Sequence, residues 1–431
     1  MKRCHAGLTL SLALAFPAAP AASEDAIDDR VWAAVDAPDA DYPAAFERLA
    51  KTPRATWRNV YAILKAGRAY DPEVPQEEPI TEEELLQKRF LAAKWQSGKL
   101  RIHNLGDEPE YWYSFRLPKS YDGLNALPVY VNLGGLALGG RHAPPDGWAT
   151  VDINWAMLTQ AATLEPMSLV TGTGFQSYLF SVLADLERRF RVDRDRVFLG
   201  GDGRAANGVW YQAMSWPDLW AGAIAVNGHY KILPELHGNL DGDRVLAAFS
   251  MKANRAAAAY NQSLGKRIGA TLVDFGAATG AAFERTVWEW MKSRTRDPFP
   301  KKVRYTLFDP TLRGAYWIEI REVKRTGGRR ELGIAGLDGR IEERFYIHKK
   351  LARVEAEITA PNRIAVRANN VKSFLVFLSP EQFDFANPVR IRAGGKTFEE
   401  QPSPSLATLM RNYRRHRDNR RLYPAEMLVE P

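Results

Sequence analysis

The sequence predicts an α/β fold, in which helices flank a mostly parallel central sheet. Short apolar runs between residues 100 and 296 indicate strands buried on both faces; they are Pro128–Leu133, Arg196–Leu199, Gly222–Val226, Val245–Phe249 and Ala270–Phe275. Helical periodicity fills the intervals between these runs, at Phe175–Phe190, Ala205–Ser215, Ala253–Leu264 and Ala281–Ser293. Strands that alternate with helices are typical of right-handed βαβ units around a parallel sheet.

The residues before this region divide into helices and then antiparallel strands. Apolar residues at helical spacing predict helices at Tyr42–Lys51, Ala55–Arg68 and Thr81–Ser97. The last of these begins with a capping-box pattern, and Gly98 is a plausible end. Leu100–His103 and Trp112–Leu117 alternate between apolar and polar residues, as antiparallel strands do. We therefore expect an N-terminal helical region at residues 23–98 and an α/β domain at residues 99–300.

A β-rich module is predicted for residues 301–431. Period-2 alternation indicates strands at Val303–Phe308, Ala315–Glu322, Leu351–Thr359, Arg363–Ala368, Ser373–Leu378 and Val389–Arg392. Five glycines between Gly327 and Gly339 predict a flexible loop. A helix at about Leu406–Arg417 is expected to close the module.

The first 22 residues have the pattern of an export signal. Lys2 and Arg3 precede an apolar stretch from Leu8 to Phe16, and Ala19–Ala21 offers small residues for cleavage. The stretch is too short to span a bilayer, and no later run reaches ~18 apolar residues, so we expect no transmembrane segment. We expect an exported protein, either periplasmic or extracellular. Its one cysteine, Cys4, would leave with the signal, which excludes disulfides and cysteine chemistry from the mature chain.

The chain carries a formal net charge of +8, with 59 Lys and Arg residues against 51 Asp and Glu residues. Because the two signs are interspersed, most of the excess is typical of a solvated surface. A denser basic group lies near the C-terminus and consists of Arg411, Arg414, Arg415, Arg417, Arg420 and Arg421. A helix surface would account for it, and so would contact with an acidic polymer or with lipid head groups. No motif predicts a nucleic-acid partner, a metal or a cofactor.

Several segments carry a specific resemblance; they are Tyr113–Asp122, Leu127–Gly135, Asp193–Gly201 and Trp216–Gly228. They resemble the entry strands, the nucleophile strand and the following strand of secreted bacterial α/β-hydrolases, of the esterase and prolyl-oligopeptidase-like peptidase type. The tail resembles the C-terminal module of bacterial peptidase-like hydrolases, at Arg363–Asn369, Phe374–Pro380 and Asn387–Gly394. The resemblance implies an α/β-hydrolase fold with ligands bound beyond the carboxyl ends of the strands.

In that family a strained turn between strand and helix, G-x-S-x-G, exposes the nucleophilic serine. The matching frame here runs from Gly200 to Gly208, and Gly203 holds the serine position. Glycine tolerates the strained backbone but supplies no nucleophile. Asp202 lies one residue early, where it is either a capping or hydrogen-bonding group or, less simply, a nucleophile. Arg204 and Asn207 on the following helix are candidate ligand-binding residues.

The other two members of a catalytic triad are also missing from their expected positions. The acid should follow Val245–Phe249, but no Asp or Glu occurs between Val245 and Val273. No histidine occurs between Gly238 and Ile347, and the expected histidine position is Gly280. The loop that supplies the oxyanion hole reads Asn132, Leu133, Gly134, Gly135, so its backbone N–H groups either face an anion or form a turn that needs glycine.

Other polar and aromatic residues offer weaker candidates. The sequence offers no neighbouring residues that would complete a metal site or a triad around the other candidates, which are His229, His237, His103, His142, Ser177 and Ser250. Four tryptophans near the expected carboxyl edge suit either the core or a carbohydrate- or aromatic-binding cleft; they are Trp148, Trp155, Trp210 and Trp288.

Three functions remain open from the sequence. A degenerate hydrolase would bind an unknown small molecule, peptide or envelope ligand, and is favoured by the three missing catalytic groups. A working ester or peptide hydrolase would need a nucleophile and base from elsewhere in the chain. In the third interpretation, the basic C-terminal helix binds an acidic envelope polymer and the rest is scaffold.

Overall fold

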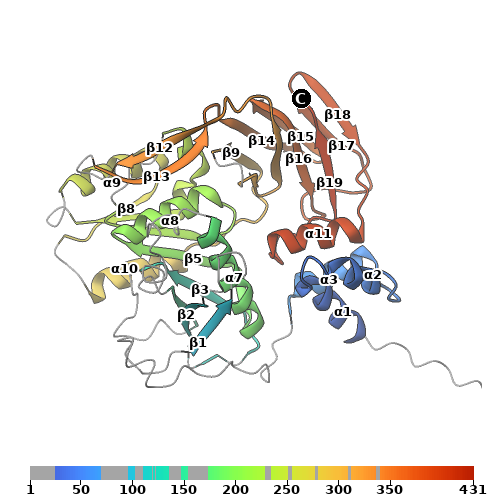
Figure 1. The fold of residues 1–431 in the computed structure, drawn as a ribbon, viewed down its shortest axis with the longest axis horizontal. Coiled ribbons are helices and arrows are strands. Elements are labelled where there is room, and N and C mark those ends of the chain that lie inside the picture. Colours follow the sequence, from blue (N-terminus) through green and yellow to red (C-terminus); the bar gives the residue numbers. More distant parts are fainter. Residues whose placement is uncertain are drawn as a thin grey trace, which may run out of the picture.

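The computed structural model describes residues 25–68, 96–101, 110–118, 120–121, 123–134, 147–153, 173–228, 234–250, 255–276, 280–308, 312–335 and 340–431. Figure 1 shows the central sheet and its helices on one side of the molecule, and the N-terminal helices together with the C-terminal strands on the other. The predicted signal, Gly135 and most of the predicted helix Thr81–Ser97 lie outside the described residues.

The central sheet has eight strands in the order β1-β2-β4-β3-β5-β6-β7-β8. Their bounds are Gln96–Arg101, Glu110–Arg116, Leu127–Asn132, Ala149–Ile153, Val192–Asp202, Gly222–Val226, Val245–Phe249 and Thr271–Asp274 for β1 to β8 in chain order. β2 is antiparallel to both β1 and β4, while the strands from β4 to β8 are mutually parallel. This order with β2 reversed is that of the α/β-hydrolase fold, so the predicted fold class is confirmed.

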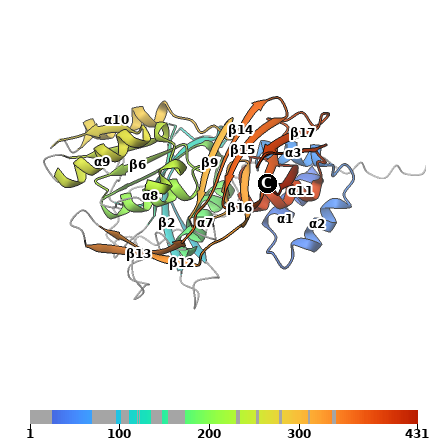
Figure 2. The same ribbon diagram turned by 90° about the horizontal axis from the view of Figure 1, so that it is seen from above.

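Helices cover both faces of this sheet; they are α7 (Thr173–Arg189), α8 (Arg204–Ser215), α9 (Arg255–Ile268) and α10 (Ala281–Lys292). Because side chains along a strand alternate between faces, β5 contributes to two separate cores. Val197 and Leu199 pack in the cluster that contains the buried side chains of α7 and α8. Phe198 packs on the opposite face, against α10. Figure 2 shows α10 on one side of the sheet and α8 on the other.

Three N-terminal helices pack on the C-terminal helix rather than on the sheet. These are α1 (Asp25–Asp36), α2 (Tyr42–Ala50) and α3 (Trp57–Ala66), and their partner is α11 (Leu406–His416). Val31, Leu49 and Leu64 share one buried cluster with Leu409 and Met410. Segments more than 300 residues apart in sequence therefore form one small bundle, which Figure 1 shows beside the C-terminal strands.

The C-terminal region contains two larger, mostly antiparallel sheets and one two-stranded sheet, which agrees with the predicted β-rich module. One has the order β18-β17-β15-β14-β9, formed by Lys396–Glu400, Val389–Ala393, Arg363–Asn369, Ala352–Ala360 and Lys302–Leu307. The other has the order β10-β11-β16-β19, formed by Gly314–Ala315, Ile318–Val323, Val371–Leu378 and Ala425–Val429. The sequence did not indicate β18 and β19.

Two local predictions were wrong. Gln96 and Ser97 were assigned to a helix, but they pair with Phe115 and Ser114 across β1 and β2, and Gly98 continues that strand. The glycine-rich segment after Gly327 was assigned to a loop, but most of it forms a hairpin of β12 (Arg329–Ala335) and β13 (Ile341–His348). Regular cross-strand hydrogen bonding overrides the weak strand propensity of its glycines.

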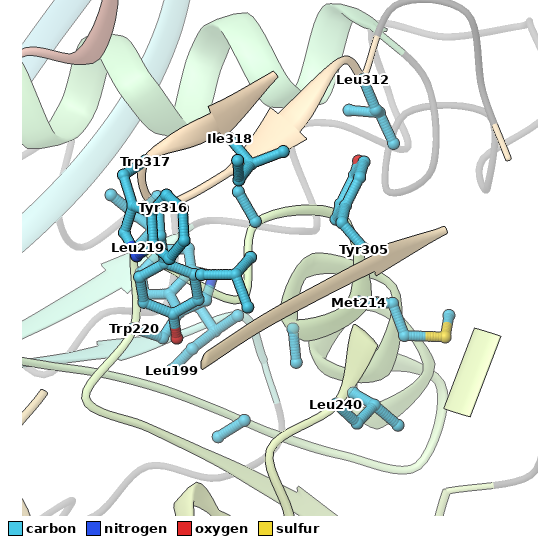
Figure 3. Close-up of a cluster of buried hydrophobic side chains, with 14 of the residues drawn as sticks. Leu199, Met214, Leu219, Trp220, Leu240, Tyr305, Leu312, Tyr316, Trp317 and Ile318 are labelled. Carbon is cyan, nitrogen blue, oxygen red and sulfur yellow. The ribbon is translucent and has the colours of Figure 1, made fainter. Parts of the chain in front are cut away.

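The sheet and the C-terminal strands share a continuous core. Figure 3 shows Leu199 of β5 and Met214 of α8 in the same cluster as Tyr305 of β9 and Trp317 beside β11. Asn239 joins the two regions, since its Nδ2 donates to Thr306 O at 2.9 Å and its Oδ1 accepts from Thr306 N at 2.7 Å. Among the described residues, no helix is long and apolar enough to cross a membrane.

Candidate functional site

The turn between β5 and α8 has the sharp geometry expected of the nucleophile turn, with Gly203 at its tip. Gly203 has φ 59° and ψ −118°, a combination that side chains with a Cβ rarely adopt. Its N–H donates to Val226 O at 2.9 Å, which fixes the turn against β6. A Cβ at Gly201 would lie 2.8 Å from the carbonyl carbon of Ala205, so the approach of strand and helix also needs glycine.

Asp202, the last residue of β5, forms hydrogen bonds with the turn after β6 and with the loop after β3. Its Oδ1 accepts from Asn227 Nδ2 at 3.0 Å, in the turn after β6. Its backbone N–H donates to Gly134 O at 3.0 Å, in the loop after β3. This arrangement supports the hydrogen-bonding interpretation of Asp202, because the carboxylate is engaged inside the protein and lies one residue before the tip.

The beginning of the oxyanion loop is occupied by a second set of internal hydrogen bonds. Asn132 Nδ2 donates to Asp152 Oδ1 at 2.6 Å, and Asn132 Oδ1 accepts from the backbone N–H of Gly134 at 3.0 Å. The N–H of Gly134 is therefore engaged by the side chain of Asn132 at the end of β3, which favours the interpretation of this glycine as part of a turn. Burial raises the pKa of Asp152, although the amide of Asn132 and the charge of Arg116 partly oppose that shift.

Sequence reasoning missed Asp152 because it did not recognise β4. Asp152 lies beside Asn132 across the parallel pair of β3 and β4, so the register itself brings the two side chains together. The signal that could have found it is the alternation Val151-Asp152-Ile153, in which both apolar residues are buried.

The expected acid and histidine positions hold a serine and a glycine. Ser250 follows β7, is buried, and donates its hydroxyl to the carbonyl oxygen of Gly276, which follows β8. Gly280 begins α10 with φ 115°, and a Cβ built on it would meet no atom of the described residues within 4 Å. These two positions lie at the same edge of the sheet as Gly203, because carboxyl ends of parallel strands share an edge.

The remaining candidates that lie among the described residues give no further catalytic group. Asn207 is buried on α8, and the backbone of Arg204 forms the first residue of that helix. His237 lies in the 3-10 helix Pro234–Asn239 together with Glu235. His103, His142, Trp155 and His229 lie outside the described residues. Within the described ranges, no three His, Cys, Asp or Glu side chains are grouped so that they could hold a metal ion.

The tryptophans near this edge belong to the core. Trp148, Trp210 and Trp288 are each less than a tenth exposed. The rings of Trp148 and Trp288 pack edge to face with centroids 5.3 Å apart. The interpretation of these three residues as a carbohydrate-binding cleft is therefore wrong, because their faces are covered by neighbouring side chains.

The six C-terminal arginines all form ion pairs within the chain. Their partners are Glu426 for Arg411, Asp39 for Arg414, Glu319 for Arg415, Asp36 for Arg417, Asp195 for Arg420, and Asp218 with Asp418 for Arg421. Intramolecular pairing thus accounts for the basic group without an acidic polymer.

No family model and no curated protein matches the sequence. Solved structures with a similar fold include a thermostable esterase, at 14% identity and TM-score 0.37, covering 47% of this chain and 64% of that one. A ferulic acid esterase from Anaeromyces mucronatus is similar at 13% identity and TM-score 0.36, covering 46% of this chain and 90% of that one. An S-formylglutathione hydrolase from Staphylococcus aureus is similar at 14% identity and TM-score 0.34, covering 46% and 96%. The α/β-hydrolase fold of this chain is defined by its own strand order.

Proposed function

We propose that this protein is a catalytically degenerate α/β-hydrolase that binds a ligand or partner and does not cleave ester or peptide bonds. The observation that carries the proposal is Gly203 at the tip of the turn between β5 and α8. A serine hydrolase needs a hydroxyl at that tip, with an imidazole to accept its proton. Here the tip has no side chain, and the sequence has no histidine between Gly238 and Ile347.

Several polar groups at this edge are hydrogen-bonded to one another. Asp202 is bonded to Asn227, and Asn132 is bonded to both Asp152 and the N–H of Gly134. An oxyanion hole requires donors aimed at a vacant position, whereas the N–H of Gly134 already has an acceptor. These bonds act as a scaffold that holds the loops after β3, β5 and β6, and this supports a structural role for the former catalytic edge.

Export to the cell envelope is part of the same proposal. It is supported by the sequence pattern of Lys2 and Arg3, the apolar stretch from Leu8 to Phe16 and the small residues at Ala19–Ala21. N-terminal sequencing of the protein recovered from a periplasmic extract tests it. A mature chain that begins near Ser23 is expected, and a cytoplasmic chain that retains Met1 would contradict it.

The activity is tested with a fluorophosphonate probe, which labels activated serines covalently. We expect no labelling of the mature protein above that of a heat-denatured sample. Gly203→Ser supplies a hydroxyl at the tip but no base, so it is expected to remain unlabelled as well. Labelling of the native protein that disappears in Ser250→Ala would identify a working nucleophile and would favour the alternative, an active esterase or peptidase.

A further inference from the structure

A cavity of about 560 Å³ lies at the amino edge of the sheet, opposite the former catalytic edge. Its walls come from α1, the end of α3, α7, the first residues of β5 and the loop after α11. β5 has 11 residues, which at about 3.3 Å a residue places its two ends roughly 30 Å apart. Figure 1 shows α7 extending toward the N-terminal helices at this end of the sheet. The cavity is within the size range of small-molecule sites.

The lining of this cavity is strongly basic. Seven basic and three acidic side chains line it. Each acid is already paired: Asp36 with both Arg68 and Arg417, Glu187 with Arg194, and Asp193 with Arg196. Two further bases pair with acids outside the lining, Lys65 with Glu381 and Arg420 with Asp195, so the uncompensated positive charge is that of Arg188 and Arg191.

Two arginines of the lining have no carboxylate partner among the described residues. Arg188 lies exposed in the last turn of α7. Arg191 follows three residues later, and its Nη1 donates to the carbonyl oxygen of Leu124 at 2.8 Å. Arg420, on the other side, uses its Nε for Asp195 at 2.6 Å, while its side chain is 47% exposed. These guanidinium groups retain donors for an anion.

The wall formed by α7 changes from apolar to basic along its length. Phe180, Ala184 and Arg188 line the cavity at intervals of four residues, so they lie on one face of the helix. Phe180 is 36% exposed, although its ring packs edge to face against Trp216. Trp32 of α1 lines the cavity as well, with the guanidinium of Arg68 5.0 Å from its ring centre. A molecule with an apolar body and an anionic head group would match both ends of this wall.

We propose that this cavity binds a phosphorylated small molecule, with the phosphate held by Arg188 and Arg191. A phosphate carries nearly two negative charges at neutral pH, and its oxygens match the planar fork of a guanidinium. The excess of more than one positive charge favours phosphate over a single carboxylate. This site goes beyond the proposed function, because it lies at the opposite edge of the sheet and does not depend on whether the former catalytic edge is active.

Calorimetry of the mature protein with phenyl phosphate tests the site. Arg188→Gln and Arg191→Gln are each expected to weaken binding about tenfold, since each removes a charge-assisted contact worth about 1.4 kcal/mol. The matched control is Arg285→Gln, because Arg285 is an exposed residue of α10 that does not line this cavity and forms no ion pair with another described residue. It should bind as the native protein does. Binding is also expected to weaken with added salt.

Two sources of the phosphate can be separated in the same assay. Binding of phenyl phosphate in solution, without binding to phosphatidylglycerol vesicles, supports a free phosphate ester. Binding to the vesicles that is lost in the Arg188→Gln, Arg191→Gln double variant supports a lipid head group. Equal affinity of native and double-variant protein for both probes, or no binding to either, overturns the proposal.

A further outcome would give the cavity a different occupant. Residues 71–84 contain seven acidic side chains and begin three residues after Arg68 in the sequence. If phenyl phosphate binds only after these acids are replaced by amides, the proposal is overturned and the cavity is assigned to that segment. Fluorophosphonate labelling has no bearing on either result, so failure of this inference and failure of the proposed function are distinguishable.

Discussion

Arg296 and Asp418 form an ion pair that is completely buried, with Nη1 and Oδ2 2.6 Å apart. Arg296 follows α10, whereas Asp418 lies in the loop after α11, between Arg417 and Arg420 of the cavity wall. The same guanidinium reaches Asp195 of β5, with Nη2 and Oδ1 2.8 Å apart. One arginine therefore fixes the loop after α11 against the amino end of the sheet, which positions the wall of the proposed phosphate site.

We predict that Arg296→Met destabilises the protein strongly. The substitution keeps the side-chain length but leaves the buried carboxylates of Asp195 and Asp418 without this partner. Removal of one member of a buried pair typically lowers the free energy of unfolding by about 3–5 kcal/mol. Arg196→Ala is the control, because its pair with Asp193 is 40% exposed on the arginine side, and a loss of at most about 1 kcal/mol is expected. Urea unfolding measures both, and similar losses would contradict the prediction.

The stability contributed by Asp418 is expected to vanish in acid. Burial alone would raise the pKa of Asp418, but Arg296 and Arg421 outweigh it and hold this pKa well below its usual range. A carboxylate with a depressed pKa in the folded state stabilises that state above its unfolded pKa of about 4, and the contribution is lost as pH falls further. The free-energy difference between native protein and Asp418→Asn should therefore be constant from pH 7 to 5 and shrink below pH 4. A constant difference down to pH 2.5 would refute this.

The periodic parts of the fold could be predicted from the sequence, because a strand or helix shows its burial in its own spacing. β6 and β7 have the predicted bounds, residue for residue. β4 has the same length as β6 and β7, but it was missed because Thr150 and Asp152 interrupt its apolar run, and Asp152 was missed with it. The hairpin of β12 and β13 was missed because its glycines resemble a loop.

In the candidate site and its surroundings, too, local sequence patterns predicted some features and missed others. Gly203 and Gly280 could be placed in the turns before α8 and α10, because each follows a strand that the sequence indicates. The pairing of Arg296 with Asp418 could not be predicted, because the two residues are 122 positions apart in the sequence. Nothing in the local sequence distinguishes a buried arginine from an exposed one. For the same reason, six arginines near the C-terminus looked like a surface group, although each has an acidic partner in the fold.

Gly203→Ala is predicted to destabilise the protein through backbone strain. A Cβ at φ 59° and ψ −118° places the backbone in a sparsely populated conformation, which costs about 1–3 kcal/mol. Gly238→Ala is the control, because Gly238 has no positive φ and an added Cβ would meet its nearest atom, Arg353 Nη2, at 3.9 Å. That change should be neutral or stabilising by up to about 1 kcal/mol. Equal unfolding midpoints for the two variants would show that the turn is not strained.

The hydrogen bond between Asn132 and Asp152 predicts that Asn132→Asp destabilises the protein and that Asp152→Asn compensates for it. Asn132→Asp places two carboxylates within bonding distance, so one of them must take up a proton or the two repel each other. We expect it to lower the free energy of unfolding by about 1.5–3 kcal/mol at pH 7, and by less at pH 4. Adding Asp152→Asn should recover most of that loss, because the new amide donates to the new carboxylate, which still accepts from Gly134 N–H. Chemical unfolding of the two single variants and the double variant measures the coupling energy. If the two losses merely add, the bond contributes nothing to holding this edge together.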